Sequence, residues 1–160
     1  YFKRTPLIGN VAVAFLCAAA PLFPMGGEWT VPVLWAAYFA AGFNLIREMV
    51  KDIQDVDGDA EAGMFSTAVM LGPKTTLRLS RFLWMLILGS PILAFLSKDF
   101  GLIYLLGIIV LYFPIAFTGF ILSFAPIENR RMAFLSLSLK LAGTGLIVSL
   151  YLEAYLGRLV

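Results

Sequence analysis

Four acidic side chains recur at helical spacing in the first half of the chain. Glu48, Asp52, Asp55 and Asp59 are separated by four, three and four residues, so on a helix they share one face, while Asp57 points to the opposite side. Neighbouring carboxylates in such a row repel each other by roughly 0.2–0.5 kcal/mol per pair on an exposed helix. We therefore expect a cation to offset this repulsion.

The residue types present in the chain limit which kind of cation can bind to this row. The chain has no histidine and one cysteine, Cys17, which excludes histidine-based zinc sites and triads. A hard cation with oxygen ligands fits the row best, and Mg²⁺ prefers one or two carboxylates together with waters and substrate phosphates. Four basic side chains near the row could complete such a phosphate site: Lys3, Arg4, Arg47 and Lys51. The alternative is a solvated helix whose acids pair with neighbouring basic residues, and the spacing alone leaves both open.

The composition as a whole is that of a membrane protein. Charged residues make up 14% of the chain and hydrophobic residues 61%, with a mean hydropathy of +0.90, whereas soluble domains carry roughly 25% charged residues. The net charge of +2 gives no indication of nucleic-acid binding. Lipid is therefore the expected solvent for most side chains.

The apolar residues form five stretches long enough, or nearly so, to cross a membrane. We predict an all-α, multi-pass transmembrane bundle with these spans: Leu7–Pro24, Val31–Ile46, Phe82–Ser97, Leu102–Ala125 and Ala133–Tyr155. The acidic row continues out of the second span as a helix. Between the second and third spans, residues 47–81 form a long aspartate-rich connection.

Basic residues divide unevenly between the two sides of this predicted bundle. The N-terminal side holds ten of the twelve: Lys3, Arg4, Arg47, Lys51, Lys74, Arg78, Arg81, Arg130, Arg131 and Lys140. Only Lys98 and Arg158 fall on the other side. Because cytoplasmic loops carry an excess of Lys and Arg, we expect a cell-membrane protein whose acidic row faces the cytoplasm.

Three motifs resemble the UbiA superfamily of intramembrane prenyltransferases. Residues 47–59, of the form Arg-Glu-x-x-Lys-Asp-x-x-Asp, look like its second aspartate-rich motif. The stretch from Ser66 to Lys74, ending in Gly-Pro-Lys, is similar to the segment that follows it. Residues 3–10, Lys-Arg-Thr-Pro-Leu-Ile-Gly-Asn, resemble the entry to the fifth helix. The resemblance covers residues 1–160 as the C-terminal half of a nine-helix protein, so we expect an upstream half with a first aspartate-rich motif.

The resemblance implies a Mg²⁺-dependent transfer of a polyprenyl group from its diphosphate. Asp52, Asp55 and Asp59 would be the catalytic, metal-binding acids. Lys3, Arg4, Arg47 and Lys51 would hold the diphosphate. The form of the motif is similar to the archaeal-type branch, which implies a geranylgeranyl-like donor and a prenylated glycerol phosphate acceptor in ether-lipid synthesis. An aromatic acid or quinone precursor is the alternative acceptor.

Two further polar residues are candidates for substrate binding. Asn10 lies just inside the first span, where it could reach the substrate or equally form hydrogen bonds between helices. Lys140 lies near the cytoplasmic end of the last span, where it could bind an acceptor phosphate or simply extend to the membrane interface. We therefore include both in the predicted site.

Two readings without prenyl transfer compete with this one. An ion-coupled transporter could use the acidic row as an ion site, although transporter sites usually lie at the middle of the membrane and these acids lie at one edge. A structural membrane subunit would leave the acidic row without an explanation.

Overall fold

The computed structural model describes residues 7–23 and 29–156, and this part of the chain is helical with no strand. The predicted all-α class is therefore confirmed for the described residues. The helices are α1 (Ile8–Leu22), α2 (Val31–Gln54), α3 (Val56–Glu61), α4 (Thr67–Leu71), α5 (Pro73–Leu96), α6 (Leu102–Gly107), η3 (Ile108–Tyr112), α7 (Phe113–Leu122) and α8 (Asn129–Leu156).

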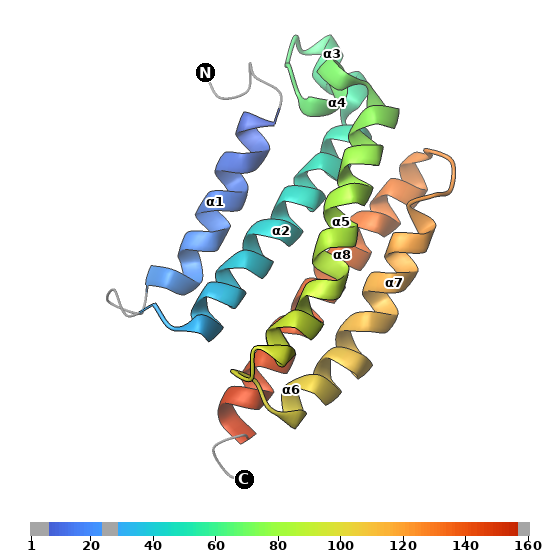
Figure 1. Cartoon of the computed structure of the whole chain (residues 1–160). Helices are drawn as coiled ribbons and strands as arrows, with labels where there is room; N and C mark the ends of the chain where they lie inside the picture. Colours follow the sequence, from blue (N-terminus) through green and yellow to red (C-terminus); the bar gives the residue numbers. More distant parts are fainter. Residues whose placement is uncertain (1–6, 24–28, 157–160) are drawn as a thin grey trace.

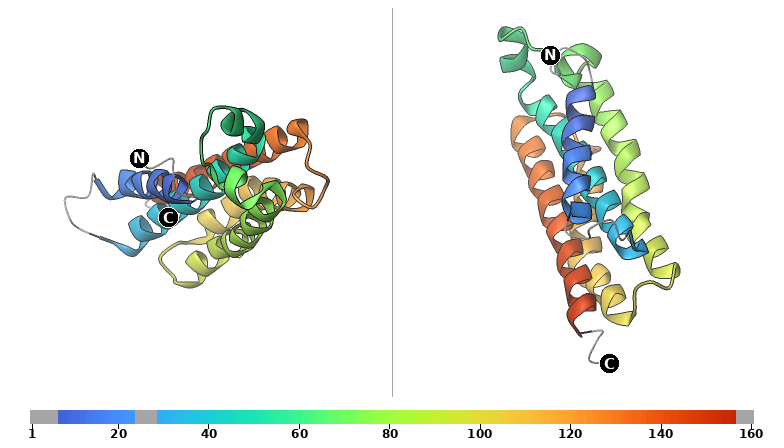
Figure 2. Two further views of the ribbon diagram at one scale, coloured as in Figure 1. Left: turned by 90° about the horizontal axis from the view of Figure 1, so that it is seen from above. Right: turned by 90° about the vertical axis from the view of Figure 1, so that its left-hand side faces the viewer.

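The helix α2 lies at the centre of the bundle. It packs against α1, α5 and α8, while α6, η3 and α7 form one continuous helix that packs on α8 (Figure 1). Figure 2 shows the long helices running side by side, with α1 on one flank. The inward face of α2 is closed to solvent, because Ile46, Met49 and Val50 are fully buried. The two cavities described below lie on other faces of the same helix.

The connection predicted over residues 47–81 is mostly helical in the structure. The helix α2 continues eight residues beyond the predicted end of its span, to Gln54, and α5 begins at Pro73 rather than at Phe82. Pro73 occupies the first turn of α5, where its missing N–H leaves no bond unmade. Gly72 has a φ of 81° and a ψ of 149°, a conformation that is nearly exclusive to glycine, and this residue turns the chain from α4 into α5.

A proline inside α5 leaves one carbonyl group of that helix without its usual donor, and a side chain from another helix helps to satisfy it. Pro91 in α5 cannot donate to the carbonyl of Ile87, which instead accepts from the hydroxyls of Ser90 at 2.8 Å and Tyr112 at 3.1 Å. Tyr104 donates to the carbonyl of Pro91 itself at 3.3 Å. Because unsatisfied backbone groups are costly in an apolar environment, the two buried tyrosines fasten the α6–η3–α7 helix to α5.

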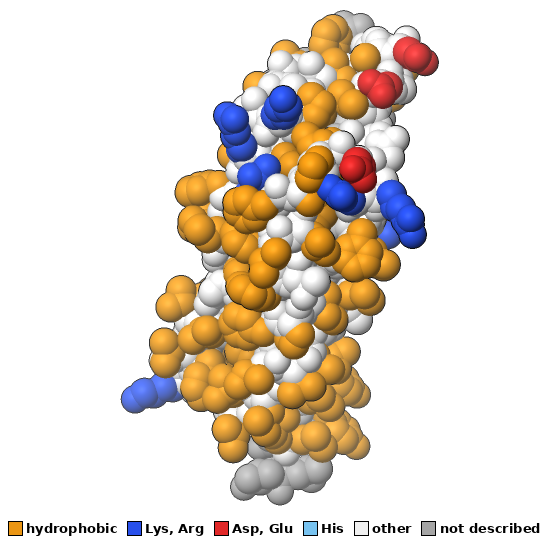
Figure 3. Space-filling model, turned by 90° about the vertical axis from the view of Figure 1, so that its right-hand side faces the viewer, with side chains coloured by type: hydrophobic (Ala, Val, Ile, Leu, Met, Phe, Trp, Pro, Cys, Tyr) orange, Lys and Arg blue, Asp and Glu red, His pale blue; other side chains and the backbone are white. Residues whose placement is uncertain are grey.

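The outer surface is largely apolar. Phe15, Val110 and Ile147 are each about two-thirds exposed or more. On the face drawn in Figure 3, charged side chains gather toward one end, with one basic group near the other. Within residues 7–23 and 29–156, three helices are long and apolar enough to cross a membrane: Pro73–Leu96, Leu102–Leu122 and Asn129–Leu156. The helix α1 is shorter and α2 ends in charged residues, so the predicted count of five spans stays a prediction.

Two glycines on α8 allow a matched test of helix packing. A methyl group at Gly145 would lie 2.5 Å from the carbonyl oxygen of Leu111, whereas one at Gly143 would lie 3.7 Å from Phe43. Gly145→Ala should therefore destabilise the protein by about 1–3 kcal/mol, and Gly143→Ala should be neutral or slightly stabilising. Thermal unfolding of the two variants in detergent measures this, and equal melting temperatures would contradict the close approach of α8 to η3.

Candidate functional site

A cavity of about 400 Å³ opens at the end of the bundle where α1, α2 and α3 meet. Its polar lining residues are Asn10, Glu48, Lys51, Asp52, Asp55, Asp59, Ser66 and Thr67. All four acids of the predicted row line this cavity. Asp57 is exposed and is not among the lining residues.

The backbone keeps the acids together although the helix is interrupted. The helix α2 ends at Gln54 and α3 begins at Val56, with Asp55 at φ −96° and ψ 5° between them. The Asp55 amide still donates to the carbonyl of Lys51 at 2.9 Å, and the Asp59 amide to that of Asp55 at 2.8 Å. The spacing of four residues per hydrogen bond is thus preserved across the bend, and Asp59 stays on the side of the cavity.

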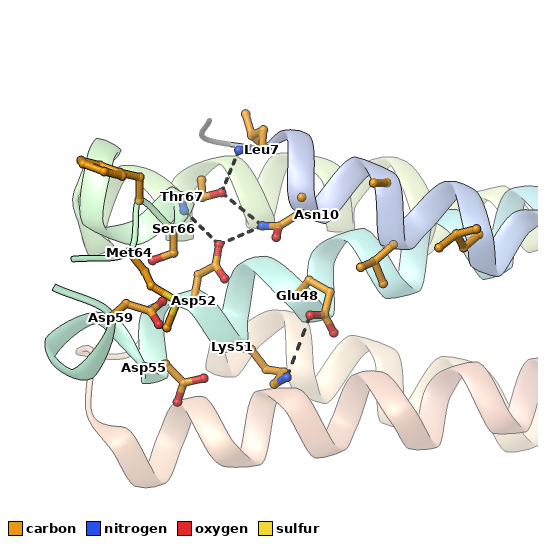
Figure 4. A pocket seen from close by; sticks show the side chains of 15 residues that line it. Leu7, Asn10, Glu48, Lys51, Asp52, Asp55, Asp59, Met64, Ser66 and Thr67 are labelled. Atoms are coloured by element: carbon orange, nitrogen blue, oxygen red, sulfur yellow. Dashed lines mark hydrogen bonds and ion pairs between the residues drawn. The ribbon is translucent and has the colours of Figure 1, made fainter. Parts of the chain in front are cut away.

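Asp52 is held by residues distant in sequence. Its Oδ2 accepts from the side-chain amide of Asn10 at 2.9 Å and from the backbone amide of Thr67 at 3.1 Å (Figure 4). The amide of Asn10 also donates to Oγ1 of Thr67 at 3.1 Å. In Figure 4 Asp52 turns toward this pair, whereas Asp55 points away from it. The two acids therefore present their oxygens to different parts of the cavity.

The basic residues of the row pair with Glu48. Arg47 lies 2.9 Å and Lys51 4.0 Å from the two oxygens of this carboxylate. Among residues 7–23 and 29–156, none of Asp52, Asp55 and Asp59 forms an ion pair. The solvated-helix alternative thus describes Glu48, but it leaves three carboxylates without a cationic partner in the described part of the chain.

The donor set of the cavity fits a hard cation that also binds phosphate. Its ligating atoms are carboxylate and amide oxygens, which Mg²⁺ prefers. The described part of the chain contains no group of three acidic or cysteine side chains close enough to bind a metal ion by themselves. Mg²⁺ needs only one or two carboxylates when waters and phosphate oxygens supply the rest, so the aspartates of this cavity are a sufficient protein contribution without forming a group of three.

A second cavity of about 860 Å³ lies between α1, α2 and α8. Its walls are mostly apolar and include Phe39, Phe43 and Ile147. Arg47 and Lys140 are the basic groups in its lining. Nε of Arg47 is buried and has no hydrogen-bond partner among the described residues. This groove has the shape and polarity for an elongated apolar molecule with an anionic head.

The structure thus divides the predicted site residues between two cavities. Asn10 and Lys51 line the acidic cavity, whereas Arg47 and Lys140 line the apolar groove. Lys3 and Arg4 lie outside the described residues. The sequence interpretation gave no role to Thr67, which is 1% exposed and contacts both Asn10 and Asp52. The available signal was its position in the motif from Ser66 to Lys74.

Comparison with known proteins agrees with this geometry. The profile of the UbiA prenyltransferase family matches residues 1–143. The chain belongs to the UbiA prenyltransferase family. A solved structure from work on digeranylgeranylglyceryl phosphate synthase in membranes superimposes with a TM-score of 0.82 over 92% of this chain and 52% of its own, at 24% identity. This likeness shows that the two proteins share a fold. The apolar helices and the family together identify an integral membrane protein.

Several curated relatives carry the name digeranylgeranylglyceryl phosphate synthase. The chain is 39% identical to the one from Methanopyrus kandleri over 49% of its own length and 29% of the relative. It is 36% identical to that of Methanoculleus marisnigri over 74% and 43%, and 34% identical to that of Sulfolobus acidocaldarius over 68% and 40%. The chain therefore spans less than half the length of these curated relatives.

Two aspartates give a matched test of the acidic cavity. In the full-length protein, Asp52→Asn should lower kcat/KM by roughly 10²–10³-fold, the cost of removing one group that stabilises developing charge. Asp57→Asn should leave it unchanged, because Asp57 lies outside the cavity. Steady-state prenyl-transfer assays of the two purified variants decide this. Equal losses for both would show that net charge matters and the cavity does not.

Proposed function

We propose that this chain forms part of the active site of a Mg²⁺-dependent prenyltransferase. The enzyme transfers a geranylgeranyl-like group from its diphosphate to a prenylated glycerol phosphate, a step of membrane ether-lipid synthesis. The observation that carries the proposal is a cavity lined by three aspartates that have no cationic partner among the described residues, in a chain of the UbiA prenyltransferase family. The names of the curated relatives support the choice of acceptor.

On the donor side, Asp52, Asp55 and Asp59 contribute the metal-binding oxygens. Bound Mg²⁺ supplies charge neutralisation of the departing diphosphate. Lys51 lines the same cavity and binds diphosphate oxygens, and Lys3 and Arg4 are proposed to do the same from the preceding segment. Arg47 contributes positive charge from the other side of α2, next to its partner Glu48. Each of these groups favours the leaving group over the intact donor.

On the acceptor side, the apolar groove between α1, α2 and α8 suits a lipid. Its walls can take an isoprenoid chain, and Lys140 and Arg47 can bind a phosphate at its charged end. A charged head and an apolar tail are the two features of a prenylated glycerol phosphate. Asn10 lines the acidic cavity instead, and its side-chain carbonyl oxygen can accept a hydrogen bond from a substrate.

The proposed arrangement in the membrane follows from the basic residues. In Figure 1 the end of α2 and the starts of α5 and α8 lie toward the end of the bundle that carries α3, and the connection between α5 and α6 lies at the other end. By their places in the sequence, Lys51, Lys74 and Arg130 belong to the first group of segments and Lys98 to the second. By the positive-inside rule, the acidic cavity faces the cytoplasm. We propose five spans in this chain, with α1 and α2 completing the count, out of nine in the whole protein.

The alternatives differ in what they leave unexplained. An aromatic acid or quinone precursor also carries a charge, but it has no long chain to occupy the 860 Å³ groove. An ion-coupled transporter does not account for membership of a prenyltransferase family. We therefore retain the aromatic acceptor only as the competing outcome of the assay below.

A competition assay tests the acceptor. The full-length enzyme, with Mg²⁺ and geranylgeranyl diphosphate, receives a prenylated glycerol phosphate and an aromatic acid in the same reaction, and the products are separated by mass. We expect the ether product alone. Prenylation of the aromatic acid alone would overturn the ether-lipid assignment and leave prenyl transfer intact, whereas no product from either acceptor would overturn the enzyme reading.

Lys140 gives a test of the groove. Lys140→Ala should raise the KM for the phosphate-bearing acceptor and leave kcat nearly unchanged, the pattern of a contact made equally in ground state and transition state. The KM for the prenyl diphosphate serves as the internal control and should not move. An increase in the donor KM instead would place Lys140 at the diphosphate.

A further inference from the structure

The hydrogen bonds to Asp52 are concentrated on one of its two oxygens. Both donors, Nδ2 of Asn10 and the backbone amide of Thr67, reach Oδ2. Among the described residues, no donor reaches Oδ1. A carboxylate held in this way cannot rotate about its Cβ–Cγ bond without breaking two charge-assisted hydrogen bonds. The orientation of Oδ1 is therefore set by Asn10 and Thr67.

The two donors are themselves held firmly. Oγ1 of Thr67 accepts from the amide of Asn10 and from the backbone amide of Leu7, each at 3.1 Å. The carbonyl of Thr67 accepts from Oγ1 of Thr76 at 3.3 Å. Thr67 is 1% exposed and Thr76 is fully buried. Through these bonds the start of α1 and the helices α2, α4 and α5 are joined at one point.

We propose that Asn10 and Thr67 are positioning residues, which fix the Asp52 carboxylate so that Oδ1 is presented to the cation and the diphosphate; the inference rests on the proposed function. Partners that orient a metal ligand typically account for 10–100-fold in metal affinity. Asn10 is suited to the task because its amide carries two N–H donors, one used for Asp52 and one for Thr67. The position of α1 on α2 therefore determines the orientation of Asp52, the proposed metal ligand on α2.

Metal binding tests this without relying on turnover. The probe is Mn²⁺ with inorganic pyrophosphate, and binding to the full-length protein in detergent is followed by electron paramagnetic resonance. Asn10→Leu removes both donors at similar size and should weaken Mn²⁺ binding roughly tenfold. In an Asp52→Asn background the same change should have little further effect, since residues that act through each other are not additive.

A second pair of variants separates positioning from folding. Thr67→Val keeps the backbone amide but loses Oγ1, the acceptor that holds Asn10, and should weaken Mn²⁺ binding in the same direction. Thr67→Ser restores the oxygen and should restore binding. Asn129→Leu, at the exposed start of α8, is the matched control for loss of an asparagine and should bind Mn²⁺ as the unmodified protein does.

The possible outcomes distinguish the inference from the function on which it rests. If Asn10→Leu weakens binding equally with and without Asp52, or if Thr67→Ser fails to restore it while the protein melts normally, the positioning role is refuted. If the unmodified full-length protein binds no Mn²⁺ in the presence of pyrophosphate, the proposed function itself fails and the inference falls with it.

Discussion

Asp52 carries a carboxylate at the end of a helix whose neighbouring residues Met49, Val50 and Ile53 are buried. Near the apolar part of a membrane protein, such a charge must be stabilised by donors from the same chain. Asn10 and Thr67 supply them. Because these residues come from α1 and α4, satisfying one carboxylate fixes how the first helix and the helical connection sit on α2. The shape of the acidic cavity follows from this requirement.

The helix α2 separates two kinds of chemistry. Its acidic face lines one cavity, while Arg47 lines the apolar groove beside α8. Glu48 lies at the boundary, where it pairs with Arg47 and, more distantly, with Lys51. In the described part of the chain these two basic groups pair with Glu48 and not with the three aspartates. A cation bridged by phosphate oxygens can then occupy the acidic side, and an anionic head group can occupy the basic end of the groove.

In the rest of the bundle, too, polar groups without a partner in their own helix are satisfied by other helices, and these contacts make the bundle rigid. Proline at position 91 leaves the carbonyl of Ile87 without its helical donor, and the hydroxyl of Tyr112 fills the place from another helix. Gly145 lets α8 approach the backbone at Leu111. Pro91 and Gly145, which would weaken an isolated helix, thus permit contacts between helices. They hold α5 and α8, and through them α2, in fixed positions below the site.

The sequence by itself determined the helical class, the apolar surface and the grouping of Glu48, Asp52, Asp55 and Asp59 along one cavity. These properties are local, since the helical repeat and the hydropathy of a segment need no distant partner. It also carried the family resemblance. Only the tertiary structure decided that Thr67 and Asn10 hold Asp52, across 15 and 42 residues, that Arg47 and Lys140 share a groove, and that α5 begins at Pro73 rather than at Phe82. These depend on how helices pack, which no local spacing specifies.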